Sequence, residues 1–479
     1  MRVCGWVQAL RLQRRMQFVV LRDETGAVQL TNRRETRPEL DQRIDGLTVG
    51  SAVALTGRVV DAPQVKLGGI EVMVDSIDQL SIAEQPLPIA ENSHPDLRLD
   101  WRFLDLRAPR QHLIFRVGDL FEQRMRSFLL GRGFTELHTP KLMEAASESG
   151  AEVFRVDYFG SSAYLAQSPQ FYRQMAIAAG FDRVMEMGPV FRAEPSFTAR
   201  HATEFTGLDL EMAWIDSVDD VIRLEEELLA HAIAGVRDVL GRQIEEVLGV
   251  DLVVPPRPFP RVTLAAAREQ LSAAGWRPGD PASEDLDGEG ERMLSKLVAD
   301  KLGHQFVFVT DYPVSVRPFY HMRPASDPAV TSSFDLIWNG LEVTTGAQRE
   351  HRYDLLVTQA AAQGVALGPI SRYLDCFRYG CPPHGGLGIG VSRLLMKLLD
   401  LPSIREATLF FRGPNRLVPR PRRPDRVGCR GRGAVVECGS RQRPTMLVAG
   451  FRLRQHFDVG DRTFGRGRHP ASAAGTGNG

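Results

Sequence analysis

The sequence predicts an α+β protein in which a small all-β barrel precedes a larger domain built on an antiparallel sheet. Two observations support this prediction. Five short segments rich in Val, Ile and Leu, separated by turns such as DETG and LGG, fall within residues 1–83 and are typical of barrel strands. From about residue 110, amphipathic helices and extended segments follow one another without the regular strand–helix repeat of a doubly wound sheet.

The sequence divides into four parts of different composition. We expect a barrel at residues 1–83, a proline-containing linker at 84–109 and the larger domain at 110–419. The remaining residues, 420–479, form an Arg/Gly/Pro-rich tail that we expect to be largely disordered. In the larger domain, helical periodicity is found at residues 112–133, 218–240 and 289–303. Strands are predicted at residues 183–194, 206–215, 305–313, 332–349 and 387–393.

Length and composition limit the classes of protein. The chain has 479 residues, and its 43% hydrophobic content is enough for two or three folded domains. No run of eighteen apolar residues occurs and the N-terminus carries arginines where a signal peptide is apolar, so we expect a cytoplasmic protein that does not enter the membrane. The cysteines are scattered without zinc-site spacing and are expected to be reduced thiols.

The formal net charge of zero is the sum of an acidic body and a basic tail. The tail, residues 420–479, contains 13 arginines and four acidic residues, a net charge of +9 that leaves residues 1–419 at −9. An acidic body can still bind nucleic acid where its basic groups cluster, so the total charge does not exclude that partner.

One segment, FRAEPSFTARHATEFTGLDLEM at residues 191–212, combines charged and aromatic side chains in an unusual way. It holds two arginines, a histidine and four carboxylates interleaved with three phenylalanines. A solvated surface needs no such aromatic partners, and a core does not accept so many charges without pairing them. Two antiparallel strands joined by a loop of this length can place Arg192, Arg200, His201 and Phe205 around one triphosphate and one flat ring.

This pattern resembles motif 2 of the class II aminoacyl-tRNA synthetases, and GLGIGVSRLLM at 386–396 resembles their motif 3. The helix ending in LLGRGF and the strand TELHTPKL resemble motif 1, with Pro140 where this class has a proline at its dimer interface. With LAQSPQFYRQ (165–174) and GLEVTTGAQREHR (340–352), residues 1–419 resemble the archaeal and eukaryotic aspartyl-tRNA synthetases. The barrel then corresponds to that family's OB-fold anticodon-binding domain.

The resemblance implies an aspartate–tRNA ligase that forms aspartyl-adenylate from L-aspartate and ATP and transfers the aspartyl group to the 3′ end of tRNA(Asp). It also implies Mg²⁺ as a cofactor and a homodimer. Two alternatives remain open from the sequence. One is a paralogue that makes aspartyl-adenylate for a small acceptor, and the other is a non-catalytic tRNA-binding paralogue.

The resemblance also implies roles for individual residues. Arg192 is the expected catalytic residue, because a guanidinium offers a rigid fork of donors to the α-phosphate. The residues expected to bind ATP are Arg192, Glu194, Arg200, His201, Phe205, Glu342, Gly390 and Arg393. Those expected to bind aspartate are Glu148, Gln170, Arg173, Arg192, Thr345 and Arg349. The expected metal ligands are Asp335, Glu342 and Thr345, whose oxygens suit Mg²⁺.

Simpler interpretations of these residues exist. Without the resemblance, Phe205 would be read as a core aromatic, and Asp335 and Glu342 as independent surface charges. Arg173, taken alone, would be read as part of a helix surface.

Two barrel positions concern the choice of tRNA. In the resembled family, strict readers of the aspartate anticodon tend to have Trp two residues after the Trp of GW and Lys in the KLG turn, and relaxed readers tend to have His and Pro. Here GWVQ places Gln8 at the first position and VKLG keeps Lys66 at the second. Gln8 lacks the stacking surface of Trp, so we expect tRNA(Asn) to be charged as well. The alternative is that Gln8 faces solvent and Lys66 alone keeps the enzyme strict.

Overall fold

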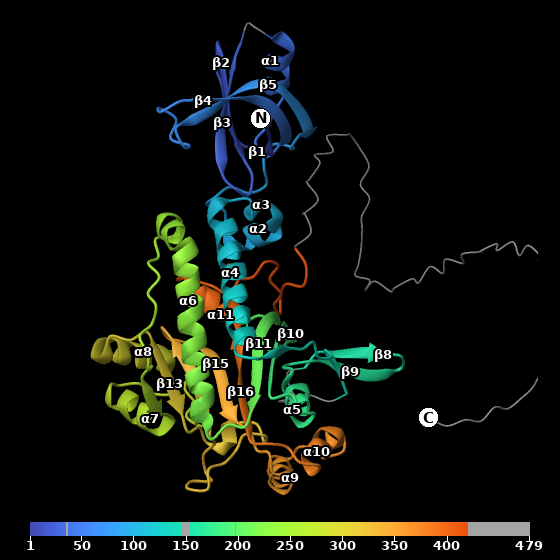
Figure 1. Cartoon of the computed structure of the whole chain (residues 1–479), viewed down its shortest axis with the longest axis vertical. Coiled ribbons are helices and arrows are strands. Elements are labelled where there is room, and N and C mark those ends of the chain that lie inside the picture. Colours follow the sequence, from blue (N-terminus) through green and yellow to red (C-terminus); the bar gives the residue numbers. More distant parts are fainter. Residues whose placement is uncertain (35–36, 145–152, 197, 420–479) are drawn as a thin grey trace, which may run out of the picture. The chain divides into compact units, whose positions relative to one another are not determined.

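The computed structural model describes residues 1–34, 37–144, 153–196 and 198–419 (Figure 1). The predicted tail, residues 420–479, and the predicted aspartate-binding Glu148 lie outside these residues. No helix in the described ranges is both long enough and apolar enough to cross a membrane.

The N-terminal part is a closed five-stranded barrel, as predicted. Its strands follow the order β1-β2-β3-β5-β4, with β3 and β5 parallel and the other neighbours antiparallel. The strands are β1 (Arg2–Leu12), β2 (Met16–Arg22), β3 (Ala27–Arg33), β4 (Ala52–Asp61) and β5 (Ile70–Ser81), and helix α1 (Pro38–Asp45) joins β3 to β4. In β2 every second side chain is buried, including Val19 and Leu21, because successive strand residues point to opposite faces.

The predicted linker, residues 84–109, contains two short helices, α2 (Pro95–Asp100) and α3 (Arg102–Asp105). The buried guanidinium of Arg102 forms an ion pair with Asp105 at 2.5 Å and donates hydrogen bonds to main-chain carbonyls between residues 405 and 409. The second half of this stretch is therefore bonded to the end of the larger domain, and the longest segment without helix or strand is residues 84–94.

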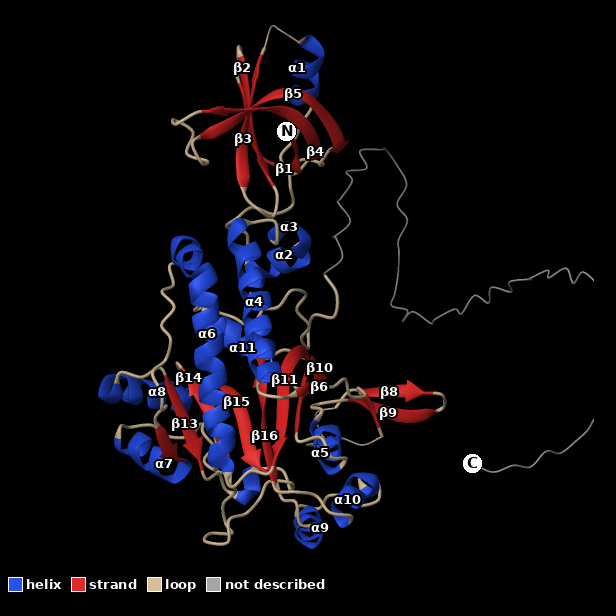
Figure 2. Ribbon diagram, in the orientation of Figure 1, coloured by secondary structure: helices blue, strands red, loops and turns tan. Residues whose placement is uncertain are grey.

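The larger domain is built on an eight-stranded sheet, in agreement with the predicted antiparallel α+β fold (Figure 2). Its order is β12-β13-β14-β15-β16-β11-β10-β6, and only the β12/β13 and β10/β6 pairs are parallel. The strands are β6 (Thr135–Glu136), β10 (Arg183–Phe191), β11 (Glu204–Ala213), β12 (Arg261–Thr263), β13 (Phe306–Thr310), β14 (Ser333–Trp338), β15 (Leu341–Gln348) and β16 (His384–Gly390). A separate three-stranded sheet is formed by β7 (Leu142–Met143), β8 (Arg155–Tyr158) and β9 (Ser161–Leu165).

Helices surround the main sheet. They are α4 (Pro109–Gly131), α5 (Gln170–Ala178), α6 (Val218–Leu248), α7 (Leu264–Ala273), α8 (Gly288–Leu302), α9 (Tyr353–Ala362), α10 (Ser371–Arg378) and α11 (Val391–Leu398). The long helices α4 and α6 run side by side, and α6 packs on β15 and β16 (Figure 2). Helix α6 starts at a capping box on Ser217 and Asp220 and ends at Gly249, whose φ of 74° is the left-handed conformation that glycine adopts without strain.

Alternation along two central strands gives the sheet one apolar and one polar face. On β11, Leu208 and Leu210 join the core that includes α4 and α6, so Asp209 and Glu211 point to the opposite face. The adjacent strand β16 has glycines on that face: a Cβ on Gly386 would lie 2.1 Å from the Leu210 carbonyl oxygen. The carboxylates of β11 thus extend over glycines, and the space above them forms the cavity described next.

Candidate active site

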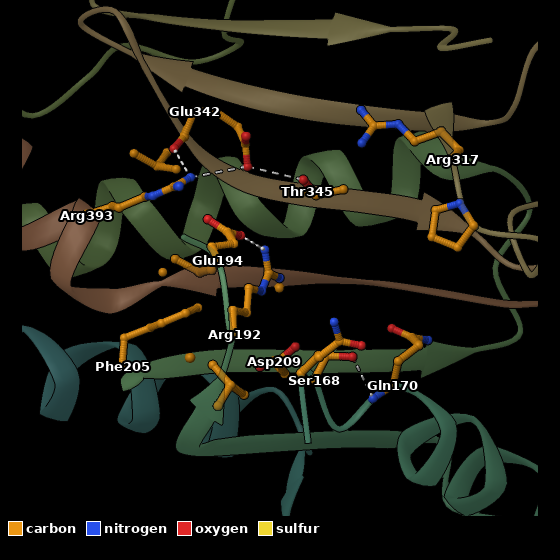
Figure 3. A pocket seen from close by; sticks show the side chains of 18 of the residues that line it. Ser168, Gln170, Arg192, Glu194, Phe205, Asp209, Arg317, Glu342, Thr345 and Arg393 are labelled. Atoms are coloured by element: carbon orange, nitrogen blue, oxygen red, sulfur yellow. Dashed lines mark hydrogen bonds and ion pairs between the residues drawn. The ribbon is translucent and has the colours of Figure 1, made fainter. Parts of the chain in front are cut away.

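A cavity of about 570 Å³ opens on the face of the sheet that α6 does not cover. Strands β10, β11, β15 and β16 contribute its floor, and the loops around Arg200 and Arg317 contribute its walls (Figure 3). It brings together all the predicted ATP- and aspartate-binding residues that the structure describes.

One end of the cavity is buried and carries paired charges. Arg173 on α5 is only 2% exposed, so it is not part of a helix surface. Its guanidinium forms an ion pair with Asp209 at 3.1 Å and donates to Gln170 Oε1 at 2.6 Å and to the Leu210 carbonyl at 2.7 Å. Since Gln170 also donates to Glu211 at 3.3 Å, α5 and β11 are joined by one polar network.

Arg349, which follows β15, belongs to the same network. Its Nε donates to Oε1 of Glu211 at 2.9 Å and its Nη1 donates to Nε2 of His321 at 2.9 Å, whereas no described residue accepts a hydrogen bond from its Nη2. Burial alone would raise the pKa of Glu211, but Arg349 and Arg173 lower it below its ordinary value. The buried end therefore contains an ionised acid and a guanidinium whose remaining donor is available to a ligand.

His321 supports Arg349 in a defined tautomer. Because the guanidinium is always a donor, Nε2 of His321 accepts and the ring proton lies on Nδ1. Nδ1 has no partner among the described residues, and burial together with Arg349 lowers the pKa of this imidazole well below its ordinary value. The ring is thus neutral at the wall of the cavity.

The other end of the cavity is more open. The Arg192 side chain is 40% exposed, lies 5.8 Å from the Phe205 ring and is 3.9 Å from Glu194. Strands β10 and β11 pair up to Phe191 and Glu204, and the next main-chain hydrogen bond runs from the Arg192 N–H to the Thr203 carbonyl, so Arg192 lies just beyond the strand that pairs with the strand of Phe205. Burial and the nearby Arg393 lower the pKa of His201, so this ring is neutral at neutral pH.

Arg200 and Arg393 lie at the rim of this open end. Arg200 pairs with the buried Glu291 of α8 at 2.9 Å, and burial raises the pKa of Glu291 to about 7. Arg393, which opens α11 after Gly390, donates to the Glu342 carbonyl at 3.0 Å. Phe205 and Arg393 reach toward the cavity from opposite walls (Figure 3).

The three expected metal ligands meet around one hydroxyl. Thr345 Oγ1 donates to Asp335 at 2.7 Å and lies 3.4 Å from Glu342. The other oxygen of Asp335 accepts from Arg317 at 2.6 Å, and the Arg317 guanidinium stacks on Tyr312 at 3.6 Å. Asp335 and Glu342 are therefore members of one site and not independent surface charges.

The donor chemistry of this cluster fits Mg²⁺. Two carboxylates and a hydroxyl are hard oxygen donors, and Mg²⁺ is commonly held by one or two carboxylates together with substrate phosphates and water. In the described part of the chain, no group of three or more His, Cys, Asp or Glu could hold a metal by itself. The cluster therefore suits an ion that arrives with a phosphate ligand.

The predicted tRNA-reading residues are placed differently. Gln8 and Lys66 are both exposed. Gln8 is the extra residue of a β-bulge between Val7 and Ala9, and its amide oxygen accepts from Arg22 at 3.1 Å.

Sequence reasoning missed five charged or polar residues that build the site: Asp209, Glu211, Glu291, Arg317 and His321. A signal for three of them exists in the sequence. Asp209 and Glu211 alternate with leucines on a strand, and Glu291 interrupts the buried stripe of α8 that includes Leu294 and Val298. Arg317 and His321 lie outside any helix or strand with a periodic pattern.

Comparisons with known proteins agree with this geometry. Residues 94–413 match the family described as tRNA synthetases class II (D, K and N), and residues 1–80 match the OB-fold nucleic acid binding domain. The chain is thus a class II tRNA synthetase with an OB-fold domain, a class of ATP-dependent ligases.

Similar proteins show to which family of class II tRNA synthetases the chain belongs. The chain is 41% identical over 424 residues to the aspartate–tRNA(Asp/Asn) ligase of Aeropyrum pernix, covering 87% of this chain and 95% of that protein. It is 40% identical to the aspartate–tRNA(Asp) ligase of Pyrococcus abyssi, and the match covers 87% of this chain and 96% of that protein. The solved structure of the asparaginyl-tRNA synthetase of Pyrococcus horikoshii with asparaginyl-adenylate superposes on this structure with a TM-score of 0.80 at 33% identity. The superposition covers 88% of this chain and 96% of that chain. The chain belongs to the aspartate–tRNA ligase family.

Proposed function

We propose that this protein is an aspartate–tRNA ligase that activates L-aspartate with ATP and transfers the aspartyl group to the 3′ end of tRNA(Asp). The observation that carries the proposal is the division of one cavity between a buried end with Arg349 and an open end with Arg192 and Phe205. A small acid and a nucleotide would meet where these two ends join.

At the buried end, Arg349 would bind the side-chain carboxylate of aspartate through Nη2, because Nε and Nη1 are engaged by Glu211 and His321. A site built around such a donor disfavours a neutral amide of the same shape. The other proposed aspartate-binding residues are Glu148, Gln170, Arg173, Arg192 and Thr345, and Arg173 would act by holding Gln170 and Asp209.

At the open end, the α-carboxylate of aspartate attacks the α-phosphate and pyrophosphate leaves. Arg192, which directly follows β10, would neutralise charge on the α-phosphate as it develops, and preorganised charge of this kind supplies most of the catalysis in such a displacement. Arg200 and His201 would hold the outer phosphates, and Phe205 and Arg393 the adenine. Glu194, Glu342 and Gly390 line the same end.

We propose that Asp335, Glu342 and Thr345 hold Mg²⁺ together with ATP. The bound ion would neutralise part of the charge on the phosphates. Arg317 keeps Asp335 paired in this structure and fixes its orientation toward Thr345.

We further propose a homodimer, since Pro140 of the motif 1 resemblance is exposed and open to contact by a second chain. Light scattering coupled to gel filtration measures this state directly. The proposed domain boundaries remain 1–83 for the barrel, 84–109 for the linker and 110–419 for the catalytic domain. A cytoplasmic location accords with an enzyme that supplies translation.

For the tRNA, we propose that the barrel binds the anticodon and that tRNA(Asn) is charged in addition to tRNA(Asp). Support comes from Gln8, which lacks an aromatic ring, and from relatives such as that of Methanopyrus kandleri, which is named aspartate–tRNA(Asp/Asn) ligase. The product on tRNA(Asn) would then require an amidotransferase.

Two assays test the proposal together. Aspartate-dependent exchange of pyrophosphate into ATP reports the first step, and charging of purified tRNA(Asp) reports the second. Exchange without charging would indicate an adenylate-forming paralogue with a small acceptor. A folded protein inactive in both assays would be a non-catalytic paralogue.

A further inference from the structure

Four residues at the open end of the cavity form a closed ring of polar contacts. Arg200 Nη1 donates to Oε2 of Glu291 at 2.9 Å, and the same oxygen accepts the main-chain N–H of Glu342 at 3.1 Å. Arg393 Nη1 then donates to the Glu342 carbonyl at 3.0 Å, and its Nε donates to the Arg200 carbonyl at 3.4 Å. Arg200, Glu342 and Arg393 belong to the segments that resemble the class II synthetases. Glu291 of α8 does not.

Glu291 is placed to act on Arg200 and not on a ligand. Its side chain is buried, and a buried carboxylate requires partners. Both partners, the Arg200 guanidinium and the Glu342 N–H, belong to residues that line the cavity. Helix α8 also makes room for the arginine: a Cβ on Gly288 would lie 3.0 Å from both Nη atoms of Arg200.

We propose that Glu291 is a positioning residue that holds the Arg200 guanidinium at the phosphate end of the cavity before ATP binds. This inference rests on the proposed assignment of Arg200 to the outer phosphates. An arginine side chain loses much rotational freedom when it is fixed, so a partner that fixes it in advance removes this cost from ATP binding. Nη1 faces Glu291, and the other donors of Arg200 remain for phosphate oxygens.

The first test removes the carboxylate. Glu291→Ala is expected to raise the KM for ATP in pyrophosphate exchange about tenfold or more, the range of one charge-assisted hydrogen bond, and to leave the KM for aspartate unchanged. Glu291→Gln keeps an acceptor for Arg200 and for the Glu342 N–H, so its KM for ATP should lie between those of wild type and Glu291→Ala. The matched control is Glu289→Gln, an exposed acid in the same helical turn, which should change neither KM. A general structural role for Glu291 would instead raise both KM values or lower only the melting temperature.

A double-mutant cycle separates this inference from the assignment on which it rests. If Glu291 acts through Arg200, then adding Glu291→Ala to Arg200→Ala should change the KM for ATP by less than about twofold. Additive losses would overturn the positioning role alone. An unchanged KM for ATP in Arg200→Ala would overturn the phosphate assignment and, with it, this inference.

Gly288→Ala provides a second perturbation that leaves Glu291 intact and covers the case in which Glu291→Ala does not fold. The added methyl group would lie 3.0 Å from both Nη atoms, so the Arg200 guanidinium must shift by a few tenths of an ångström, while the helical backbone at this position accepts alanine. We expect the KM for ATP to rise, as in Glu291→Ala, with a wild-type melting temperature. An unaltered KM for ATP in Gly288→Ala would overturn the proposal.

Discussion

The cavity and the barrel surface hold their predicted functional residues in opposite ways. In the cavity, Arg349 and Arg173 are buried and bonded to acids on β11 before any substrate is present. On the barrel, Gln8 and Lys66 are exposed, and the amide oxygen of Gln8 accepts a hydrogen bond from Arg22. On the proposed assignment, chemistry on small substrates relies on side chains that the fold fixes in advance, whereas reading an anticodon is left to side chains that RNA itself can order.

The difference has an energetic consequence. Removing one partner of a buried ion pair costs about 3–5 kcal/mol, because the other charge remains buried without compensation. Exposed pairs typically contribute only about 0.2–1 kcal/mol. Substitutions in the cavity should therefore affect stability and activity together where the pair is buried, and substitutions on the barrel should affect selectivity alone.

The largest effect is expected for Arg349→Leu. Glu211 would lose its 2.9 Å partner in a fully buried position, so we expect unfolding to become easier by about 3–5 kcal/mol and aspartate-dependent exchange to be abolished. Urea denaturation and pyrophosphate exchange measure the two effects.

Arg349→Lys is the matched control, because it keeps a positive charge for Glu211 and loses the planar fork. It should fold, show a raised KM for aspartate and retain the KM for ATP. Equal losses for aspartate and ATP in this variant would indicate damage to the cavity and would contradict the role of Arg349 in aspartate binding.

Arg192→Ala should separate activity from stability. This side chain is 40% exposed, so its removal should leave the free energy of unfolding within about 0.5 kcal/mol of wild type. A transition-state contact of this kind is worth about 3 kcal/mol, and exchange should fall at least roughly a hundredfold. Near-normal exchange by the folded variant would remove Arg192 from the catalytic step.

The sequence predicted the open end of the cavity better than the buried end. Arg192, Arg200, His201 and Phe205 belong to one continuous segment, so local strand pairing is enough to bring them together. The partner of Arg349, in contrast, is Glu211, which lies 138 positions earlier in the chain. Such a pair follows only from the register of β11, β16 and β15, which strand patterns in a single sequence do not determine.

Elements of the fold that depend on contacts between distant residues were likewise not predicted from local sequence patterns. The five barrel strands and the central strands of the large sheet follow from alternation and turn residues. Helices α2 and α3 were missed because they fall in a proline-containing stretch with little periodicity, and they are held by contacts of Arg102 with residues about 300 positions away.

Glu225 is a buried acid without a cationic partner, so it can be compared with the acids of the cavity that are paired with Arg173 and Arg349. It is fully buried on α6 and forms no ion pair with any described residue, and burial raises its pKa to about 8 although the hydroxyl of Thr344 acts to lower it. The folded protein therefore keeps Glu225 protonated while the unfolded chain ionises it above its ordinary pKa of 4.5. This contribution to stability is complete below that value and is lost as the pH rises toward 8.

Glu225→Gln should remove that dependence. Between about pH 5 and pH 7, the free energy of unfolding of wild type should fall relative to the variant by roughly 1 kcal/mol per pH unit. Urea denaturation of both proteins at several pH values measures the difference, in which the other titrating groups cancel. Parallel pH profiles would show that Glu225 is ionised in the folded state.

The smallest effect is expected on the barrel, from Gln8→Trp. Because the aspartate and asparagine anticodons differ only at their third base, selectivity depends on a contact worth about 1–3 kcal/mol. Wild type should charge both purified tRNAs, and the stacking surface of Trp should raise the preference for tRNA(Asp) about tenfold without changing pyrophosphate exchange or stability. Lys66→Ala tests the alternative that Lys66 alone reads the base. A wild-type preference above about a thousandfold, lost in Lys66→Ala and unmoved by Gln8→Trp, would show that the enzyme is strict and that Gln8 takes no part.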